Sequence, residues 1–323
     1  MIKFICLRIV KALVILLCIA ILNFLLIHSA PGDPAQIMAG EAGETDAQFL
    51  ADLRARFGLD QPLPIQLWKY IAAVVQLDFG FSYRQNLPVI SLIADRLPAT
   101  LLLSLSAFVI SLCLGVTAGS LAASRQGRWT DSIISTFALL FYATPLFWLA
   151  LMAVMLFSVH LNWLPGFGYE TPGSSLTGIG RLVDIGSHLI LPAMTLGFFF
   201  MAVYMRMTRA SMLEVSRLDF VKTARAKGLK SSVIQRRHIL RNALLPVVTL
   251  AGLQAGQLVS GAVLIETVFA WPGIGRLMFE ALQQRDYNLL LGIFIVSAAV
   301  VLLFNMVTDL LYRLVDPRIR LQQ

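Results

Sequence analysis

Residues whose types could do chemistry are few in this sequence, and their spacing matches no common catalytic site. The four histidines, His28, His160, His188 and His238, are scattered along the chain without the spacing of metal ligands. The three cysteines form no CxxC pair. The phosphate-binding pattern GxxxxGK[ST], the hydrolase pattern GxSxG and the metalloprotease pattern HExxH do not occur. We therefore expect no catalytic residue, no metal site and no cofactor in this chain.

A stripe of polar residues interrupts one hydrophobic stretch. Gln254, Gln257 and Ser260 are spaced by three residues, so on a helix they fall roughly on one face. Such a stripe can line a polar path across a membrane, and hydrogen bonding between helices is an equally ordinary use. Glu266 ends the same stretch, where a role at an external gate and simple solvation at the membrane interface are equally good interpretations. These four residues are the candidates for a pore or gate.

The elements that must position these residues follow from a very hydrophobic composition. Of the 323 residues, 58% are hydrophobic and 14% are charged, whereas about a quarter of the residues of a soluble domain are charged. Charge-free intervals long enough for a helix to cross a bilayer core of about 30 Å lie between residues 11 and 33, 96 and 125, 131 and 170, 184 and 206, 241 and 266, and 286 and 309. We therefore predict an all-α integral membrane protein with about six transmembrane helices.

Basic residues give the predicted orientation. With the N-terminus inside, most lysines and arginines lie in cytoplasmic segments, so both termini are expected in the cytoplasm. The net charge of +8 then reflects topology and contact with the lipid bilayer, and nucleic acid is not an expected partner. The first apolar stretch resembles a signal peptide ending near Ala30 as well, but the five later intervals favour an uncleaved helix.

The predicted organisation has three parts. Residues 1–30 form the first transmembrane helix, residues 31–98 an external segment, and residues 99–323 a core of five transmembrane helices. The external segment is too long for a bare connection, so we expect it to fold as a small helical cap. The core helices are expected near residues 99–122, 132–160, 188–205, 245–266 and 289–310. Gly115 and Gly119 have the spacing that allows close helix approach, and packing within the chain is favoured over dimerisation.

The longest cytoplasmic loop, residues 206–244, is strongly basic and carries helix boundaries. Asp219 is a good N-cap for a short helix from Phe220, and Gly228 is a good stop, with a second short helix beyond it. Phe220, Ala224 and Gly228 follow one another every four residues, so one helix face would carry a large anchor and two small residues. That face suits docking into a groove of another protein. A solvated loop that only enforces topology explains the residues equally well.

Three regions resemble one protein family, and together they cover essentially the whole chain. Residues 219–230 with 237–249 closely resemble the coupling loop of the membrane subunits of binding-protein-dependent ABC importers. Residues 58–64 with 78–82, and residues 266–277, are similar to the dipeptide, oligopeptide and nickel group of that family. The fold implied by this resemblance is that of a type I ABC importer permease.

The loop departs from the general family pattern of Glu-Ala-Ala, three residues, Gly, and a later Ile-x-Leu-Pro. Lys222 takes the Glu position and Thr223 the first Ala position, whereas Ala224 and Gly228 match. The later Pro is absent at Arg241. The resemblance implies that this loop lies in a groove of an ATPase subunit and transmits its closure to the pore. The residues implied in ATPase coupling are Phe220, Lys222, Thr223, Ala224, Arg225, Ala226, Lys227, Gly228 and Leu229.

The resemblance also implies a function and its partners. The chain would be the transmembrane pore subunit of an ATP-driven importer in the bacterial inner membrane, and di- or oligopeptides would be the favoured solute. Implied partners are a second homologous permease subunit, two ATPase subunits that hold ATP and Mg, and a periplasmic substrate-binding protein. The residues alone leave open a stand-alone channel or secondary transporter whose basic loop is only topological.

Overall fold

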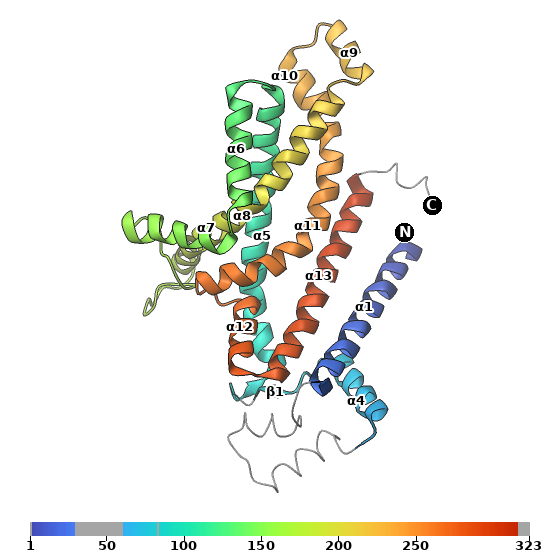
Figure 1. The fold of residues 1–323 in the computed structure, drawn as a ribbon, viewed down its shortest axis with the longest axis vertical. Coiled ribbons are helices and arrows are strands. Elements are labelled where there is room, and N and C mark those ends of the chain that lie inside the picture. The colour runs from blue at the N-terminus through green and yellow to red at the C-terminus, as the bar shows by residue number, and fades with distance from the viewer. Residues whose placement is uncertain (1, 30–60, 83, 316–323) are drawn as a thin grey trace. The chain divides into compact units, whose positions relative to one another are not determined.

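The computed structural model describes residues 2–29, 61–82 and 84–315, with the side chains of some helical residues left undescribed, and these residues are mainly helical. The chain divides into two compact units, which are described in turn. One unit comprises Met1–Pro98 and Gly273–Leu302, and the other comprises Ala99–Pro272 and Leu303–Gln323 (Figure 1). Two long helices contribute to both units.

The first unit consists of helices and a short β-hairpin. Val89, Ile93, Leu277, Leu289 and Ile293 form its apolar core, each with at most 1% of its surface exposed. Phe81 pairs with Pro88 in the antiparallel hairpin. Its elements are α1 (Ile2–Ser29), α4 (Leu63–Val75), β1 (Phe81–Ser82), β2 (Leu87–Pro88), the start of α5 (Val89–Ser124), α12 (Ile274–Gln284) and the first part of α13 (Tyr287–Val315).

Helix α13 begins at a buried aspartate. Asp286 is fully buried, and its carboxylate accepts a hydrogen bond at 3.1 Å from the backbone N–H of Leu289 in the first turn, as an N-cap residue does. The hydroxyl of Ser82 donates to the same carboxylate. One turn later, a Cβ added at Gly292 would lie 2.6 Å from a Val89 methyl group. The hairpin and the starts of α5 and α13 are therefore held together within this unit.

The second unit surrounds helix α8. Its largest buried side chains include Leu103, Leu196, Tyr204, Phe269 and Trp271. Its elements are the remainder of α5, α6 (Trp129–Ala143), α7 (Leu146–Ala153), the π-helix η1 (Val154–His160), α8 (Ile179–Val215), α9 (Asp219–Ala226), α10 (Ser231–Val233), the π-helix η2 (Ile234–Leu240) and α11 (Arg241–Val268).

Predicted close packing at two glycines is confirmed. A Cβ at Gly115 would lie 2.5 Å from the Cβ of Tyr204, and one at Gly119 would lie 2.6 Å from the carbonyl oxygen of Met205. Glycine is therefore required where α5 crosses α8, because any side chain would push the two backbones apart.

Four helices in the described part of the chain are long and apolar enough to cross a membrane, namely α1, α5, α8 and α13. The pair formed by α6 and α7 with η1 makes a fifth if it is one span. Helix α11 covers the range of the predicted fifth helix, residues 245–266. The count of about six and the cytoplasmic placement of both termini stay predictions.

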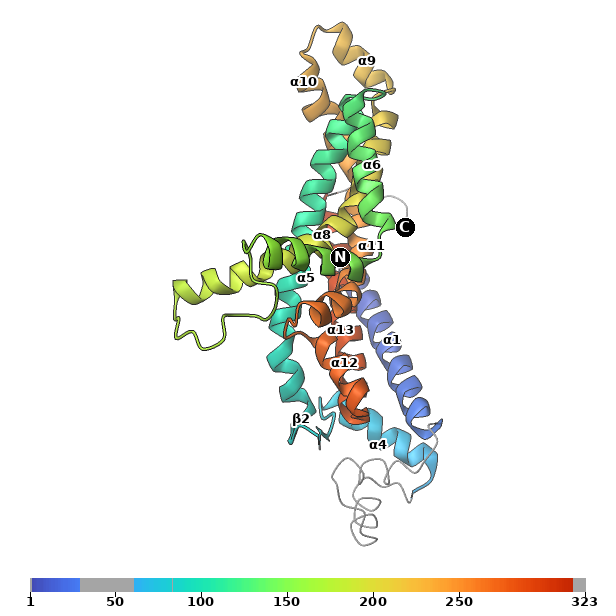
Figure 2. The same ribbon diagram turned by 60° about the vertical axis from the view of Figure 1, so that its left-hand side comes forward.

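The prediction of one continuous helix over residues 132–160 is wrong. The chain bends by 104° between α6 and α7, and Figures 1 and 2 show the two pieces running in different directions. Thr144 has φ −84° and ψ 135°, because the ring of Pro145 disfavours the helical conformation for the residue before it. The break thus has a local cause.

Other helices extend beyond their predicted ends. Helix α8 covers Ile179–Val215 rather than 188–205, and α5 begins at Val89 rather than near 99. A charged residue marks the point where a helix leaves the hydrocarbon, but the helix can continue beyond it. Apolar intervals therefore underestimate helix length. Residues 30–60 of the predicted external cap lie outside the described part of the chain, and a separate cap over residues 31–98 stays a prediction.

Candidate functional site

Helix α9 of the basic loop has the predicted stop and a shifted start. Gly228 has φ +74°, its N–H donates to Arg225 O at 2.9 Å, and the N–H of Leu229 donates to Ala224 O at 3.4 Å. These two bonds form a Schellman motif, which glycine favours at this position. The predicted N-cap role of Asp219 is wrong, because Leu218 occupies the N-cap and Asp219 lies in the first turn. The predicted second short helix is formed by α10 and η2.

The loop has an apolar core of its own. Val221 and Ala224 are 0% and 5% exposed and pack with Met212 of α8, Ile234 and Ile239. Of the predicted docking face of Phe220, Ala224 and Gly228, Ala224 therefore packs inside the loop. The small side chain of Ala224 lets α9 pack closely against the end of α8 and η2. Ala224 is therefore not available to a partner.

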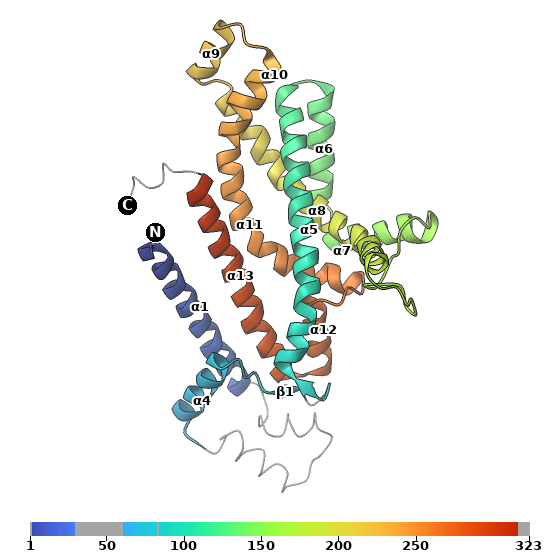
Figure 3. The same ribbon diagram turned by 180° about the vertical axis from the view of Figure 1, so that it is seen from behind.

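A different face of α9 is free. Lys222, Thr223 and Ala226 are exposed and, by helical spacing, lie opposite the buried Val221 and Ala224. Four further residues of the predicted coupling set are also exposed, namely Phe220, Arg225, Lys227 and Leu229. Figure 3 shows α9 and α10 beyond the ends of α8 and α11.

A bidentate ion pair fixes the same end of α8 to α6. Arg209 donates from Nε and Nη2 to the two carboxylate oxygens of Asp131, at 2.7 and 2.8 Å. Asp131 is buried and also accepts from the backbone N–H of Gly127 at 3.0 Å. Removal of the arginine would leave a buried carboxylate without its counter-charge, which destabilises a fold strongly. The sequence marked Asp131 only as the end of an apolar interval, so this contact was missed.

The predicted pore or gate residues have different surroundings. Gln254 on α11 is half-buried, and in the described part of the chain its buried Oε1 accepts no hydrogen bond. Gln257 and Ser260 lie on the same helix, but their side chains are outside the described part of the structure. Glu266 is fully buried, and Thr100 donates to it at 2.7 Å. Solvation of Glu266 at the interface is therefore wrong.

Trp271 lies in the turn that follows α11 and stabilises it. Its indole is fully buried, its Nε1 donates to Ala99 O at 2.9 Å, and its backbone N–H donates to Glu266 O at 2.8 Å. The ring also meets Tyr169 edge to face, with 4.8 Å between the ring centroids. The end of α11 is thus fastened to the second part of α5 and to the loop before α8.

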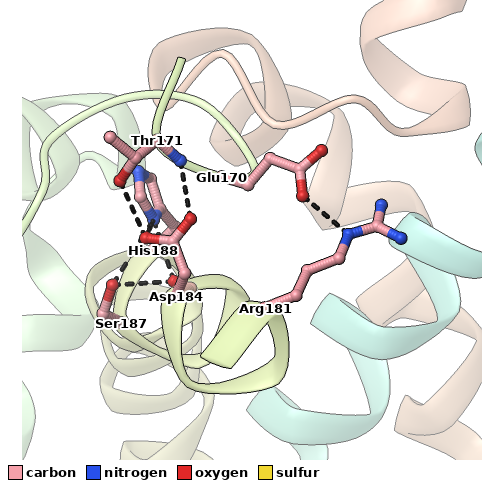
Figure 4. Close-up of polar contacts among 6 residues, drawn as sticks. All are labelled: Glu170, Thr171, Arg181, Asp184, Ser187 and His188. Atoms are coloured by element: carbon pink, nitrogen blue, oxygen red, sulfur yellow. Dashed lines mark hydrogen bonds and ion pairs between the residues drawn. The ribbon is translucent and has the colours of Figure 1, made fainter. Parts of the chain in front are cut away.

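Polar contacts also fasten that loop to the start of α8 (Figure 4). Asp184 accepts from the backbone N–H and the hydroxyl of Thr171, at 2.7 and 2.8 Å. Arg181 donates to Glu170 at 2.8 Å, and Nδ1 of the buried His188 lies 2.9 Å from Asp184 O. The contacts place this loop on one end of α8 and the basic loop on the other.

Comparison with known proteins agrees with this architecture. Residues 115–321 match the family described as "Binding-protein-dependent transport system inner membrane component", and residues 1–105 match the N-terminal region described for such membrane components. The chain is 42% identical to the dipeptide transport system permease protein DppB of Escherichia coli K12, with 99% of each chain covered. It is 39% identical to the glutathione transport system permease protein GsiC of the same strain, again with 99% of each covered.

The fold is shared with a solved transporter. An inward-facing structure of the MetNI methionine ABC transporter superposes with a TM-score of 0.57 at 17% sequence identity, over 70% of this chain and 96% of the solved chain. The likeness concerns the fold alone. Together with the membrane-spanning helices and the full-length matches, it shows that this multi-pass chain belongs to the family of inner membrane components of binding-protein-dependent transport systems.

Proposed function

We propose that this chain is the pore subunit of an importer for di- or oligopeptides. The observation that carries the proposal is the near full-length similarity to a dipeptide permease. A glutathione permease is almost as similar, and glutathione is itself a small peptide. A substrate-binding protein would deliver the peptide from outside, and ATPase subunits, which would hold ATP and Mg, would power its passage. A second permease subunit would complete the pore around the substrate.

Coupling to the ATPase is proposed for the free face of α9. Lys222, Thr223 and Ala226 are exposed there, while Val221 and Ala224 hold the helix against the rest of the loop. A helix anchored on one face and free on the other can transfer a push from a partner to α8 and α11. Closure of the ATPases would then shift the pore between two states through their different contacts with this face.

A substitution on each face separates docking from folding. Ala226→Trp adds bulk on the free face and should abolish copurification of the ATPase and uptake while membrane insertion persists. Ala226→Ser is the matched control and should behave as the parent chain. Ala224→Trp is expected to unfold the loop, because its Cβ is inside the apolar core. Full ATPase association of Ala226→Trp would contradict docking on this face.

The substrate class is tested in proteoliposomes that contain the complete importer. A dipeptide presented with the binding protein should stimulate ATP hydrolysis and accumulate inside, whereas nickel ions should do neither. Stimulation of ATP hydrolysis by nickel ions and not by the dipeptide would contradict the peptide assignment. Uptake by this chain without any ATPase would favour the stand-alone channel and contradict the importer.

The polar stripe of α11 is proposed to line the path of the peptide. Gln254 supports this because its buried Oε1 has no hydrogen-bond partner in the described part of the chain, so a peptide N–H or water can use it. Gln254→Leu should raise the KM for dipeptide uptake with the complex still assembled. Unchanged uptake kinetics would leave Gln254 a packing residue only.

A further inference from the structure

A cavity adjoins the C-terminal end of helix α9, where Arg225 and Leu229 line it. It has a volume of about 540 Å³ and is lined by the turn between α5 and α6, the end of α8, and the segment from α9 to η2. All of these belong to the second unit, and Figure 3 shows the α5–α6 turn, α9 and α10 at the same end of it. The cavity is distinct from the proposed docking face and from the α11 stripe.

The cavity is positively charged. Three arginines, Arg125, Arg128 and Arg225, line it together with serine and glutamine side chains, and none of the described acidic residues lines it. The nearest carboxylate in sequence, Asp131, already accepts hydrogen bonds from Nε and Nη2 of Arg209. Within the described residues none of the three guanidinium groups forms an ion pair. Like charges drawn together around a hollow favour an anion between them.

Its wall is apolar on the side of the helices. Met212, Ile234 and Ile239 line the cavity and are buried in the core of the loop. Arginine matches phosphate oxygens with a planar pair of N–H donors. A ring of arginines over an apolar wall is therefore suited to an anionic head group with or without attached carbon chains.

We propose that this cavity binds a phosphate-bearing anion. Two sources share this chemistry, the head group of an anionic phospholipid of the inner leaflet and free phosphate in the cytoplasm. A bound anion would bridge Arg225 on α9 to Arg125 and Arg128 on the α5–α6 turn. It would thereby set how firmly the loop is held, whether or not α9 docks an ATPase.

The test uses the full chain in a neutral detergent, followed by native mass spectrometry. The chain is titrated with dioleoylphosphatidylglycerol and, separately, with dioleoylphosphatidylcholine, each in the presence and absence of inorganic phosphate. The variant Arg125→Gln/Arg128→Gln/Arg225→Gln removes the cavity charges. The matched control Lys230→Gln/Arg236→Gln/Arg237→Gln removes the same charge from exposed positions of the same loop that do not line the cavity.

Each basic residue beside an anionic phospholipid contributes about fivefold in affinity. The cavity variant should therefore bind phosphatidylglycerol about a hundredfold more weakly, and the control should bind it as the parent does. Arg225→Gln alone should weaken binding about fivefold, which keeps the test usable if the triple variant unfolds. Selective binding of phosphatidylglycerol without competition by phosphate identifies the lipid source, and competition by phosphate identifies the soluble one.

Two outcomes would overturn the proposal. One is equal weakening in the cavity variant and the control, since only general charge would then matter. The other is equal binding of the two lipids together with no binding of inorganic phosphate. Transport is not measured in this experiment, so its result is independent of the proposed function.

Discussion

Replacement of Gly115 by alanine tests whether α5 and α8 pack backbone against backbone. The added Cβ would lie 2.5 Å from the Cβ of Tyr204 and 3.0 Å from the carbonyl oxygen of Met201. Carbon atoms in ordinary contact are about 3.5–4.0 Å apart. The two helices must therefore separate by about 1 Å to accept a single methyl group. A shift of that size also disturbs the neighbouring contacts of Tyr204, which is fully buried.

Two opposing effects set the size of the change in stability. Overpacking of a well-packed core costs about 1–3 kcal/mol. Alanine regains about 0.5–1 kcal/mol in a helix relative to glycine. The overpacking cost is the larger, because a backbone oxygen cannot move aside as a flexible side chain can. We expect Gly115→Ala to be destabilised by about 1–2 kcal/mol.

The measurement is thermal unfolding of the purified chain in detergent, followed by tryptophan fluorescence. With a shift of about 2–4 °C per kcal/mol, the variant should melt roughly 2–8 °C below the parent. Gly186→Ala on α8 is the matched control, because no neighbouring atom of the described residues lies within 4 Å of its added Cβ. The control should melt at the parent temperature or slightly above it. Equal melting temperatures of the two variants would refute the close contact of α5 and α8.

Substitutions at three further polar contacts give additional tests. Asp131→Ala should destabilise the chain by about 2–3 kcal/mol, below the cost for a fully buried pair because the Arg209 side chain is 32% exposed; in thermal unfolding, Arg209→Ala should add little to it, and additive effects would exclude the pair. Trp271→Phe removes the indole N–H that donates to Ala99 O and should cost about 1–2 kcal/mol in the same assay. Asp286→Ala removes the N-cap of α13 and should cost about 1–2 kcal/mol, whereas Asp286→Asn should keep most of the stability, because its amide oxygen still accepts the backbone N–H.

Local features of the structure could be predicted from the sequence. The left-handed stop at Gly228 and the close helix contacts of Gly115 and Gly119 were found where the residues indicated them. Each depends on the absence of a side chain at one position, and such a requirement is readable from the residue itself. The apolar intervals likewise located the long helices, because a charge in hydrocarbon is costly wherever it occurs.

The break at Thr144-Pro145 had a signal that was not used. An X-Pro pair inside a predicted helix is a probable boundary, but the uniform apolar composition on both sides suggested one continuous span. Membrane helices often tolerate proline, so a proline does not by itself show where such a helix ends. Pro192 and Pro246 indeed lie inside α8 and α11, whereas Pro145 begins a new helix.

The surroundings of the candidate site residues had no local signal. Glu266 is buried and accepts a hydrogen bond from Thr100, which lies 166 residues earlier in the chain. Ala224 is buried because η2 and the end of α8 fold over it. Its spacing from Phe220 and Gly228 suits a docking face and an internal core equally well, so only the packing of distant segments decides between them.

Helix α8 runs without interruption from the loop at Glu170 to the ion pair at Arg209 and beyond it. Its 37 residues correspond to about 55 Å at 1.5 Å per residue, nearly twice a bilayer core of about 30 Å. Pro192 cannot donate the hydrogen bond that would reach the carbonyl of His188, so the helix can flex there more easily than elsewhere along a regular turn. The helix thus has two unequal arms that meet at a flexible point near Pro192. For the same bending angle, the end of the longer arm, at the basic loop, moves further than the end of the shorter arm.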